Sequence, residues 1–164
     1  MGLFDRFRSH QIGDVALGTL DYRRGRWHGR IKLPALGEAE LQLPGNERAP
    51  SEAARAMVVE GLPYHWVALQ PAIERALFDH YEPYRDAASE LDLDDVGDAI
   101  PAIARSADVW RHVRHPLVRV ADAGDDFDVR FAFEVAWDVE HTIGIFVHDW
   151  AIYDVSGSVL RDDL

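Results

Sequence analysis

The sequence contains no cysteine, and this absence excludes several kinds of chemistry. Without thiols, the chain can form neither disulfides nor thiolate metal sites, and it has no cysteine nucleophile. Because a lack of cysteine suits a reducing compartment, we expect a cytoplasmic protein. The sequence also lacks any apolar run close to the roughly 20 residues that a membrane-crossing helix needs, so we expect no membrane span.

Common catalytic and nucleotide-binding motifs are missing as well. The chain has no G-x-S-x-G nucleophile elbow, no G-x-G-x-x-G fingerprint and no P-loop. The H-E-x-x-H spacing of zinc proteases is absent, and the acidic stretches at residues 90–98 and 122–128 lack the spacing of an EF-hand calcium loop. We therefore predict no cofactor.

Lysine is nearly absent, since Lys32 is the only lysine among 17 basic residues, whereas 29 residues are acidic. The net charge of −12 opposes binding to phosphate backbones, so we expect no nucleic-acid partner. The same charge would speed the encounter with a basic protein. It is equally compatible with a surface that is acidic for solubility alone.

Two short segments concentrate the acidic residues. The first, ELDLDDVGD, covers residues 90–98, and the second, DAGDDFD, covers residues 122–128. Each is either a solvated loop or a contact surface for a basic protein partner. The residues predicted to bind such a partner are Glu90, Asp92, Asp94, Asp95, Asp98, Asp125 and Asp126.

Apolar residues are abundant, at 48% of the chain, and include five Trp, seven Phe and five Tyr. This content can fill the core of one ordinary domain, so we treat residues 1–164 as a single domain. Residues 1–10 contain Leu3, Phe4 and Phe7 and are a candidate N-terminal docking segment.

Alternating apolar and polar residues predict strands in the first and last thirds of the chain. The first third contains three such segments, over residues 15–20, 27–33 and 38–43. The last third contains four, over residues 117–120, 127–137, 142–147 and 151–155. The longest of these segments places six large apolar residues on one face: Phe127, Val129, Phe131, Phe133, Val135 and Trp137.

The middle third of the chain has a helical pattern. Ser51 is suited to cap a helix at its N-terminus. Apolar residues then recur at steps of three and four, which indicates one buried helical stripe. Pro71 either kinks this helix or starts a new one. The stripe consists of Leu62, Trp66, Leu69, Ile73, Leu77 and Tyr81.

Together these patterns predict an α+β domain with the element order β-β-β-α-α-β-β-β-β. Its sheet is expected to be largely antiparallel, with the helices packed on one face. The apolar row of the longest strand and the helical stripe are the natural partners in this core.

One short segment, residues 137–142, combines two carboxylates and an imidazole. If the chain bends there, Asp138, Glu140 and His141 converge, and a carboxylate that holds one ring nitrogen prepares a histidine for acid–base catalysis. His141 and His148 could alternatively belong to a metal site, which needs at least three ligands. Our main interpretation is structural: the segment closes one strand and opens the next, and its polar atoms satisfy backbone groups at the turn.

Short motifs towards both ends of the chain resemble those of a group of small bacterial domains of unknown function. One half of the resemblance is L-G-T-L at residues 17–20, followed by W-x-G at residues 27–29. The other half is W-D-x-E-H-T-x-G at residues 137–144, with S-G-S-V at residues 156–159. The resemblance supplies no catalytic residues. Its association with immunity proteins, which neutralise toxins passed between bacteria, implies a protein partner.

Two functional hypotheses follow. The first is a non-catalytic protein-binding domain, of the immunity type, whose acidic surface covers a basic bacterial toxin. The alternative is a small metal-assisted or acid–base enzyme centred on Asp138, Glu140 and His141. This alternative requires that the three side chains line a concave pocket.

Overall fold

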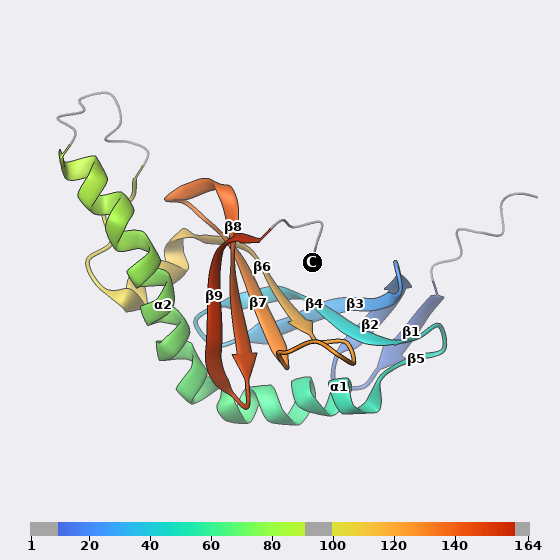
Figure 1. The fold of residues 1–164 in the computed structure, drawn as a ribbon. Coiled ribbons are helices and arrows are strands. Elements are labelled where there is room, and N and C mark those ends of the chain that lie inside the picture. Colours follow the sequence, from blue (N-terminus) through green and yellow to red (C-terminus); the bar gives the residue numbers. More distant parts are fainter. Residues whose placement is uncertain (1–9, 91–99, 160–164) are drawn as a thin grey trace, which may run out of the picture.

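Nine strands form a largely antiparallel sheet in residues 10–90 and 100–159, the part of the chain that this computed structural model describes (Figure 1). The order across the sheet is β1-β2-β3-β4-β6-β7-β8-β9, and the short β5 pairs with β4. All pairings are antiparallel except that of β4 with β6. The strands are β1 (His10–Asp14), β2 (Gly18–Arg23), β3 (Arg26–Leu33), β4 (Gly37–Asn46), β5 (Ala49–Pro50), β6 (Val113–Val120), β7 (Val129–Val135), β8 (Asp138–His148) and β9 (Ala151–Val159).

Helical segments connect the two halves of the sheet. Ser51 caps the first of them as predicted, since its hydroxyl accepts a hydrogen bond from the N–H of Ala54 at 3.5 Å. Pro71 lies inside the long helix, so it does not start a new one. No helix within residues 10–90 and 100–159 combines the length and apolar character that crossing a membrane requires. The segments are α1 (Glu52–Ala56), the π-helix η2 (Met57–Gly61), α2 (Leu62–Glu90) and the 3₁₀-helix η3 (Ser106–His112).

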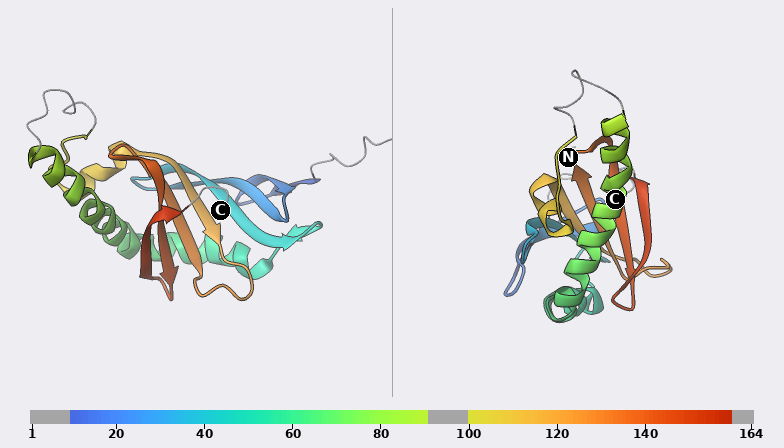
Figure 2. Two further views of the ribbon diagram at one scale, coloured as in Figure 1. Left: turned by 45° about the horizontal axis from the view of Figure 1, so that its top comes forward. Right: turned by 90° about the vertical axis from the view of Figure 1, so that its left-hand side faces the viewer.

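The α+β class and the largely antiparallel sheet were predicted correctly. The predicted order omitted β1 and β5. It placed two helices between the two groups of strands, where the structure has a continuous helical region that runs from α1 through η2 into α2. Figure 2 shows α2 running beside the sheet, with its C-terminal end extending beyond the strands.

The apolar row on β7 and the turn that follows it lies at the centre of the core. Val129, Phe131, Phe133, Val135 and Trp137 are all at most 3% exposed. The stripe on α2 packs against this row: the ring of Trp66 lies 5.8 Å from that of Phe131, and the ring of Tyr81 lies 5.5 Å from that of Trp137. The apolar residues that alternate along the strand and those that recur along α2 therefore form two surfaces in direct contact.

Phe127 does not belong to this row, and its predicted place on the core face was wrong. Its ring lies 5.2 Å from that of Phe146, and the guanidinium of Arg130 stacks on both rings. Arg130 and Phe146 are opposed on neighbouring strands and alternate with the core residues, so they lie on the other face of the sheet. The alternation fails at Phe127 because β7 begins only at Val129.

The first predicted strand, residues 15–20, is wrong in its first half, because residues 15–17 form the turn between β1 and β2. The carboxylate of Asp14 accepts hydrogen bonds from the backbone N–H groups of Ala16 (2.8 Å) and Leu17 (3.0 Å). An aspartate whose carboxylate accepts hydrogen bonds from the N–H groups two and three residues later favours a turn over a strand.

Candidate functional site

The segment after β7 forms a polar cluster around the buried carboxylate of Asp138. The carboxylate of Asp138, a residue only 6% exposed, accepts a hydrogen bond from the Tyr84 hydroxyl at 2.6 Å and lies 2.9 Å from Nδ1 of His141. Tyr84 belongs to α2, whereas Asp138 begins β8. The cluster therefore fastens the helix to the hairpin of β7 and β8.

Local backbone geometry explains why these groups meet. A two-residue turn at residues 136–137 joins β7 to β8. The strand register then shifts between Glu134 and Val135, so residues 139–141 bulge from the ladder and His141 can turn back to Asp138. The structural interpretation of this segment, in which one strand closes and the next opens, is consistent with this geometry.

The environment of the cluster shifts three pKa values. Burial raises the pKa of Tyr84 to about 12, and the hydrogen bond to Asp138 acts in the same direction. Burial alone would raise the pKa of Asp138, but hydrogen bonds from Tyr84 and His141 outweigh it and lower that pKa. Burial lowers the pKa of His80, whose Nδ1 accepts a hydrogen bond from the Trp137 indole at 3.1 Å. At neutral pH, Asp138 is therefore ionised, and Tyr84 and His80 are neutral.

Sequence reasoning missed Tyr84 and His80. Both continue the helical stripe of α2, three residues after Tyr81 and Leu77 respectively, so the spacing of the stripe would have placed them towards the sheet. Their polar partners could not be found in the same way, because Asp138 lies 54 positions from Tyr84 in the sequence.

The side chains of the other residues in the catalytic and metal alternatives do not join the cluster. Glu140 is exposed, and its contact with Asp138 is a hydrogen bond from its backbone N–H. His148 ends β8, where its ring lies 3.5 Å from Asp128 and 3.7 Å from Asp149. The strand between His141 and His148 corresponds to about 23 Å, so one ion cannot bind both histidines. Within the described residues, no group of three or more His, Asp or Glu side chains could hold a metal ion.

The acidic residues predicted to bind a partner are only partly described. Glu90 ends α2, whereas the exposed Asp125 and Asp126 lie in the loop between β6 and β7, far from that helix end (Figure 1). Residues 1–9 of the candidate docking segment lie outside the described residues. So do the predicted contacts Asp92, Asp94, Asp95 and Asp98.

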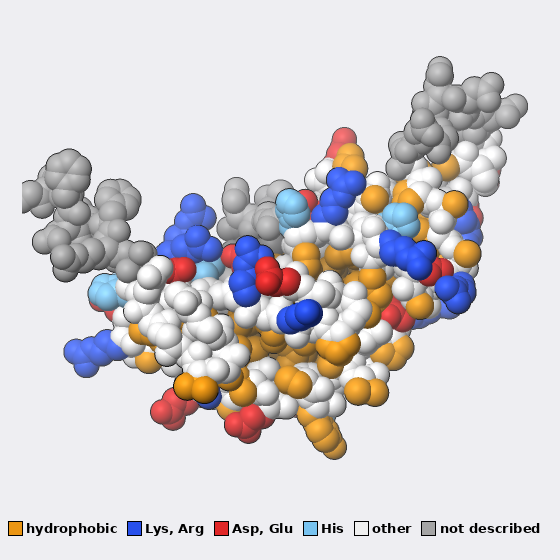
Figure 3. Space-filling view, turned by 180° about the vertical axis from the view of Figure 1, so that it is seen from behind, with side chains coloured by type: hydrophobic (Ala, Val, Ile, Leu, Met, Phe, Trp, Pro, Cys, Tyr) orange, Lys and Arg blue, Asp and Glu red, His pale blue; other side chains and the backbone are white. Residues whose placement is uncertain are grey.

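An apolar groove of about 440 Å³ lies between β3 and the start of the helical region. The turn between β1 and β2, the end of β3, η2 and the first residues of α2 contribute its walls. Viewed from the side opposite to Figure 1, apolar side chains gather in the middle of the surface, with basic side chains beside them (Figure 3). The main apolar residues that line the groove are Leu17, Ile31, Val58, Val59, Trp66 and Val67.

The floor and one wall of the groove are fixed by the fold. Trp66 is only 2% exposed, and its indole N–H donates a hydrogen bond to the carbonyl of Pro34 at 3.1 Å. Just before the turn that forms one wall, Asp14 at the end of β1 accepts a hydrogen bond from Nε of Arg55 in α1 at 2.5 Å. This hydrogen bond from Arg55 lowers the pKa of Asp14 to about 2, so the contact persists through neutral and mildly acidic pH.

The rim of the groove carries exposed apolar side chains. Val67, which lines the groove, is 82% exposed, and its helical neighbour Tyr64 is 80% exposed. Val15, in the turn between β1 and β2, is fully exposed. Scattered exposed apolar residues are ordinary, but a group around an apolar hollow is typical of an interaction site.

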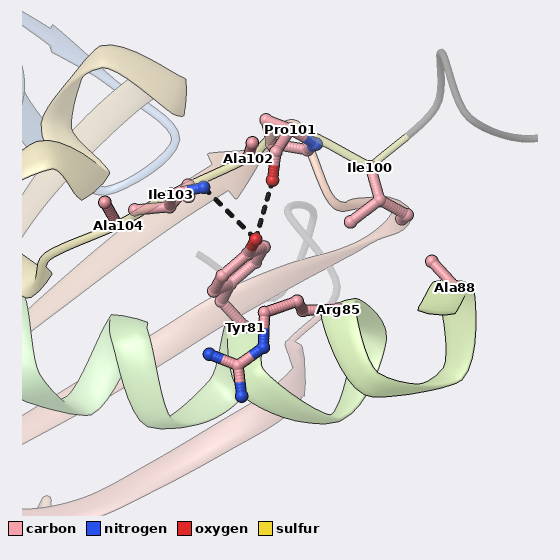
Figure 4. Close-up of a pocket in the computed structure, with 8 residues that line it drawn as sticks. All are labelled: Tyr81, Arg85, Ala88, Ile100, Pro101, Ala102, Ile103 and Ala104. Atoms are coloured by element: carbon pink, nitrogen blue, oxygen red, sulfur yellow. Dashed lines mark hydrogen bonds between the residues drawn. The ribbon is translucent and has the colours of Figure 1, made fainter. Parts of the chain in front are cut away.

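Two smaller cavities lie elsewhere. One, of about 280 Å³, separates α2 from residues 100–104 (Figure 4). There the Tyr81 hydroxyl donates a hydrogen bond to the carbonyl of Pro101 at 2.8 Å and accepts one from the N–H of Ile103 at 3.2 Å. The other, of about 260 Å³, is polar and lies around His28 and Glu40.

None of these three cavities is lined by Asp138, Glu140 or His141. None of these three cavities supplies the concave pocket that the enzyme hypothesis requires at the cluster. The groove is the largest of the three cavities, and most of the residues that line it are apolar.

The fold and the groove define a small α+β domain with an open apolar surface. The chain belongs to the family described as Domain of unknown function (DUF6985), whose model matches residues 16–160. This match confirms the resemblance to a domain of unknown function, and it spans both the groove and the Asp138 cluster. No curated protein and no solved structure matches the chain.

Proposed function

We propose that this chain is a non-catalytic protein-binding domain of the immunity type, which neutralises a bacterial toxin. The observation that carries the proposal is the groove with its exposed rim. Burial of apolar surface drives most protein–protein association, and the rim offers such surface to a partner. Trp66 and the Asp14–Arg55 contact hold the groove in shape before binding, which lowers the entropic cost of association.

The acidic surface would act at an earlier step of binding. A net charge of −12 attracts a basic partner over a distance, and such steering changes the association rate more than the final affinity. Asp125 and Asp126 are exposed on one loop and Glu90 at the end of α2, so each is accessible for such steering.

The proposal can be tested by producing the chain together with a secreted toxin encoded next to its gene. We expect the chain to restore growth of the producing cells and to form a stable complex with the toxin. We then expect Asp125→Lys to lower the association rate more than Asp154→Lys, which makes the same charge change on β9. Growth arrest despite abundant folded chain would contradict the proposal.

The acid–base alternative retains one supporting observation. His141 lies against the ionised Asp138, and its side chain is 46% exposed, so one ring nitrogen can reach solvent. If this pair were catalytic, His141→Ala would abolish an activity of the folded chain on small model esters or phosphate esters. Equal rates for the two proteins, together with no bound metal by elemental analysis, would leave the cluster with a structural role.

A further inference from the structure

Two neighbouring side chains of α2 tie the end of this helix to the hairpin of β7 and β8. Nδ1 of His80 accepts a hydrogen bond from the indole N–H of Trp137 at 3.1 Å, and the Tyr84 hydroxyl donates to Asp138 at 2.6 Å. In the described part of the chain, the hydrogen bonds and ion pairs of residues 85–90 are made with other residues of α2. The polar attachment of the last turns to the hairpin therefore depends on these two contacts.

Pro83 weakens the helix at the same place. It lies inside α2, and proline has no N–H to donate to the carbonyl four residues earlier, that of Asp79. Its ring also crowds that carbonyl, and prolines are common sites of helix kinks. The missing backbone hydrogen bond would have spanned the stretch that contains His80. The helix thus has a weak point beside one of the two side chains that attach it.

The contact with Trp137 fixes the protonation state of His80. An indole N–H can only donate a hydrogen bond, so Nδ1 must carry a lone pair and the proton of the neutral ring must lie on Nε2. A second proton on Nδ1 would make it a donor, and two N–H groups would then face each other at 3.1 Å. Burial, which lowers the pKa of His80, favours the same neutral form.

The titratable groups around His80 do not remove this conflict. On β8, the charge of Asp138 favours a protonated ring, whereas that of His141 disfavours one. On α2, the ring of Tyr84 lies 5.4 Å from that of His80, and its hydroxyl donates to Asp138. On β9, the ring meets the backbone of Gly157, where an added Cβ would lie 3.0 Å from Nε2. Among the described residues, no carboxylate bonds the His80 ring, so none is placed to accept the new N–H.

We propose that His80 is a pH-sensitive latch: on mild acidification its protonation breaks the contact with Trp137, and residues 79–90 separate from the hairpin about the weak point at Pro83. At neutral pH the unprotonated Nδ1 keeps the latch closed. Opening exposes the indole of Trp137, a residue only 2% exposed in the closed form. The latch is a property of the fold and operates whether or not the chain has bound a partner.

The test is hydrogen–deuterium exchange of the full chain at about pH 7.5 and about pH 5, on either side of the ordinary histidine pKa of about 6.5. Rates are corrected for the intrinsic pH dependence of exchange. The closed form has the lower pKa, so the latch has its full stability above the ordinary value and loses it as the pH falls below that value. We expect the opening of residues 79–90 to increase about tenfold, below a ceiling of about thirtyfold that an unhindered histidine would give at pH 5.

Matched variants identify the titrating group. His80→Asn keeps an oxygen that can accept from Trp137 but does not titrate, so its opening should change less than about threefold between the two pH values. His65→Asn makes the same change at another half-buried histidine of α2 and should keep the wild-type response. His141→Asn removes the ring beside Asp138 and should also keep it. Trp137→Phe removes the donor, so the pH response should shrink in this variant even if His80→Asn does not fold.

Four outcomes would overturn the proposal. The first is equal opening of residues 79–90 in the wild-type chain at the two pH values. The second is a full acid response in both His80→Asn and Trp137→Phe, because another group would then be the one that titrates. The third is loss of the response in His141→Asn, which would assign the effect to that histidine. The fourth is an equal increase of exchange along the whole chain, which would show global acid unfolding without a local latch.

Discussion

The hydrogen bond between Tyr84 and Asp138 yields a quantitative prediction. Tyr84→Phe removes the hydroxyl that donates to the carboxylate at 2.6 Å and leaves the rest of the ring in place. Hydrogen bonds to charged groups contribute about 1.5–3 kcal/mol, and Asp138 is too buried for water to replace the donor fully. We expect the free energy of unfolding to fall by about 2 kcal/mol at pH 7.

The assay is urea unfolding followed by tryptophan fluorescence. With a typical denaturant dependence of about 2 kcal/mol/M, the midpoint should fall by roughly 1 M. A double-mutant cycle with Asp138→Asn isolates the pair, and we expect a coupling energy above about 1 kcal/mol, within the range measured for residues in contact. A coupling energy below about 0.5 kcal/mol would refute the assignment of this bond as the link between α2 and β8.

The pH dependence provides a second check on the same bond. The folded-state pKa of Asp138 is lowered, so its stabilising effect is present above the unfolded pKa of about 3.9. This contribution is lost as the pH falls through the lower folded-state pKa. The difference between wild type and Tyr84→Phe should therefore be largest near pH 7 and should shrink below about pH 4. A difference that stays constant with pH would show that the carboxylate is not the acceptor.

Three further predictions concern other contacts. Gly61→Ala should lower the free energy of unfolding by about 1–3 kcal/mol, because the added methyl group overpacks against Trp150. In a Trp150→Ala background the same change should raise the free energy of unfolding by about 0.5–1 kcal/mol, because alanine loses less backbone entropy than glycine in a helix. Urea unfolding measures both. The phenol of Tyr84, with a pKa of about 12, should titrate at 295 nm above the usual tyrosine value of about 10, and its contribution to stability should be lost as the pH rises from about 10 towards 12. Arg26 is buried and pairs with the half-exposed Asp122. Asp122→Ala leaves the buried guanidinium without this partner, whereas Arg26→Met removes the buried charge itself. Thermal unfolding should therefore show a larger loss of stability for Asp122→Ala than for Arg26→Met.

Periodicity predicted the parts of the fold in which one face of an element is buried along its whole length. Strict alternation over residues 127–137 identified β7, which spans Val129–Val135, and steps of three and four from Leu62 to Tyr81 identified α2. It failed where a side chain bonds the backbone of the next few residues, as Asp14 does, and where a residue lies beyond the end of the strand, as Phe127 does. Those outcomes depend on local bonding that alternation does not encode.

The sites were harder to predict, because their residues come from distant segments. Asp138 and His141 are close in sequence and were recognised, but Tyr84 reaches them only through the packing of α2 on the sheet. The groove combines a turn, a strand end and a π-helix, which are far apart in the sequence. Val67 is an apolar residue in a helical segment, and the sequence pattern does not show that its side chain is exposed.

The parallel pairing of β4 with β6 has a consequence for the order of folding events. Every other pairing among the described strands closes over a short connection, whereas this pairing joins residues 40–42 to residues 117–119 across the whole helical region. Closing so long a loop costs more chain entropy, and distant pairings slow folding. We therefore expect β1–β4 and β6–β9 to fold as separate kinetic units. The rate-limiting step is then the pairing of β4 with β6, which accompanies the packing of α2 on the sheet.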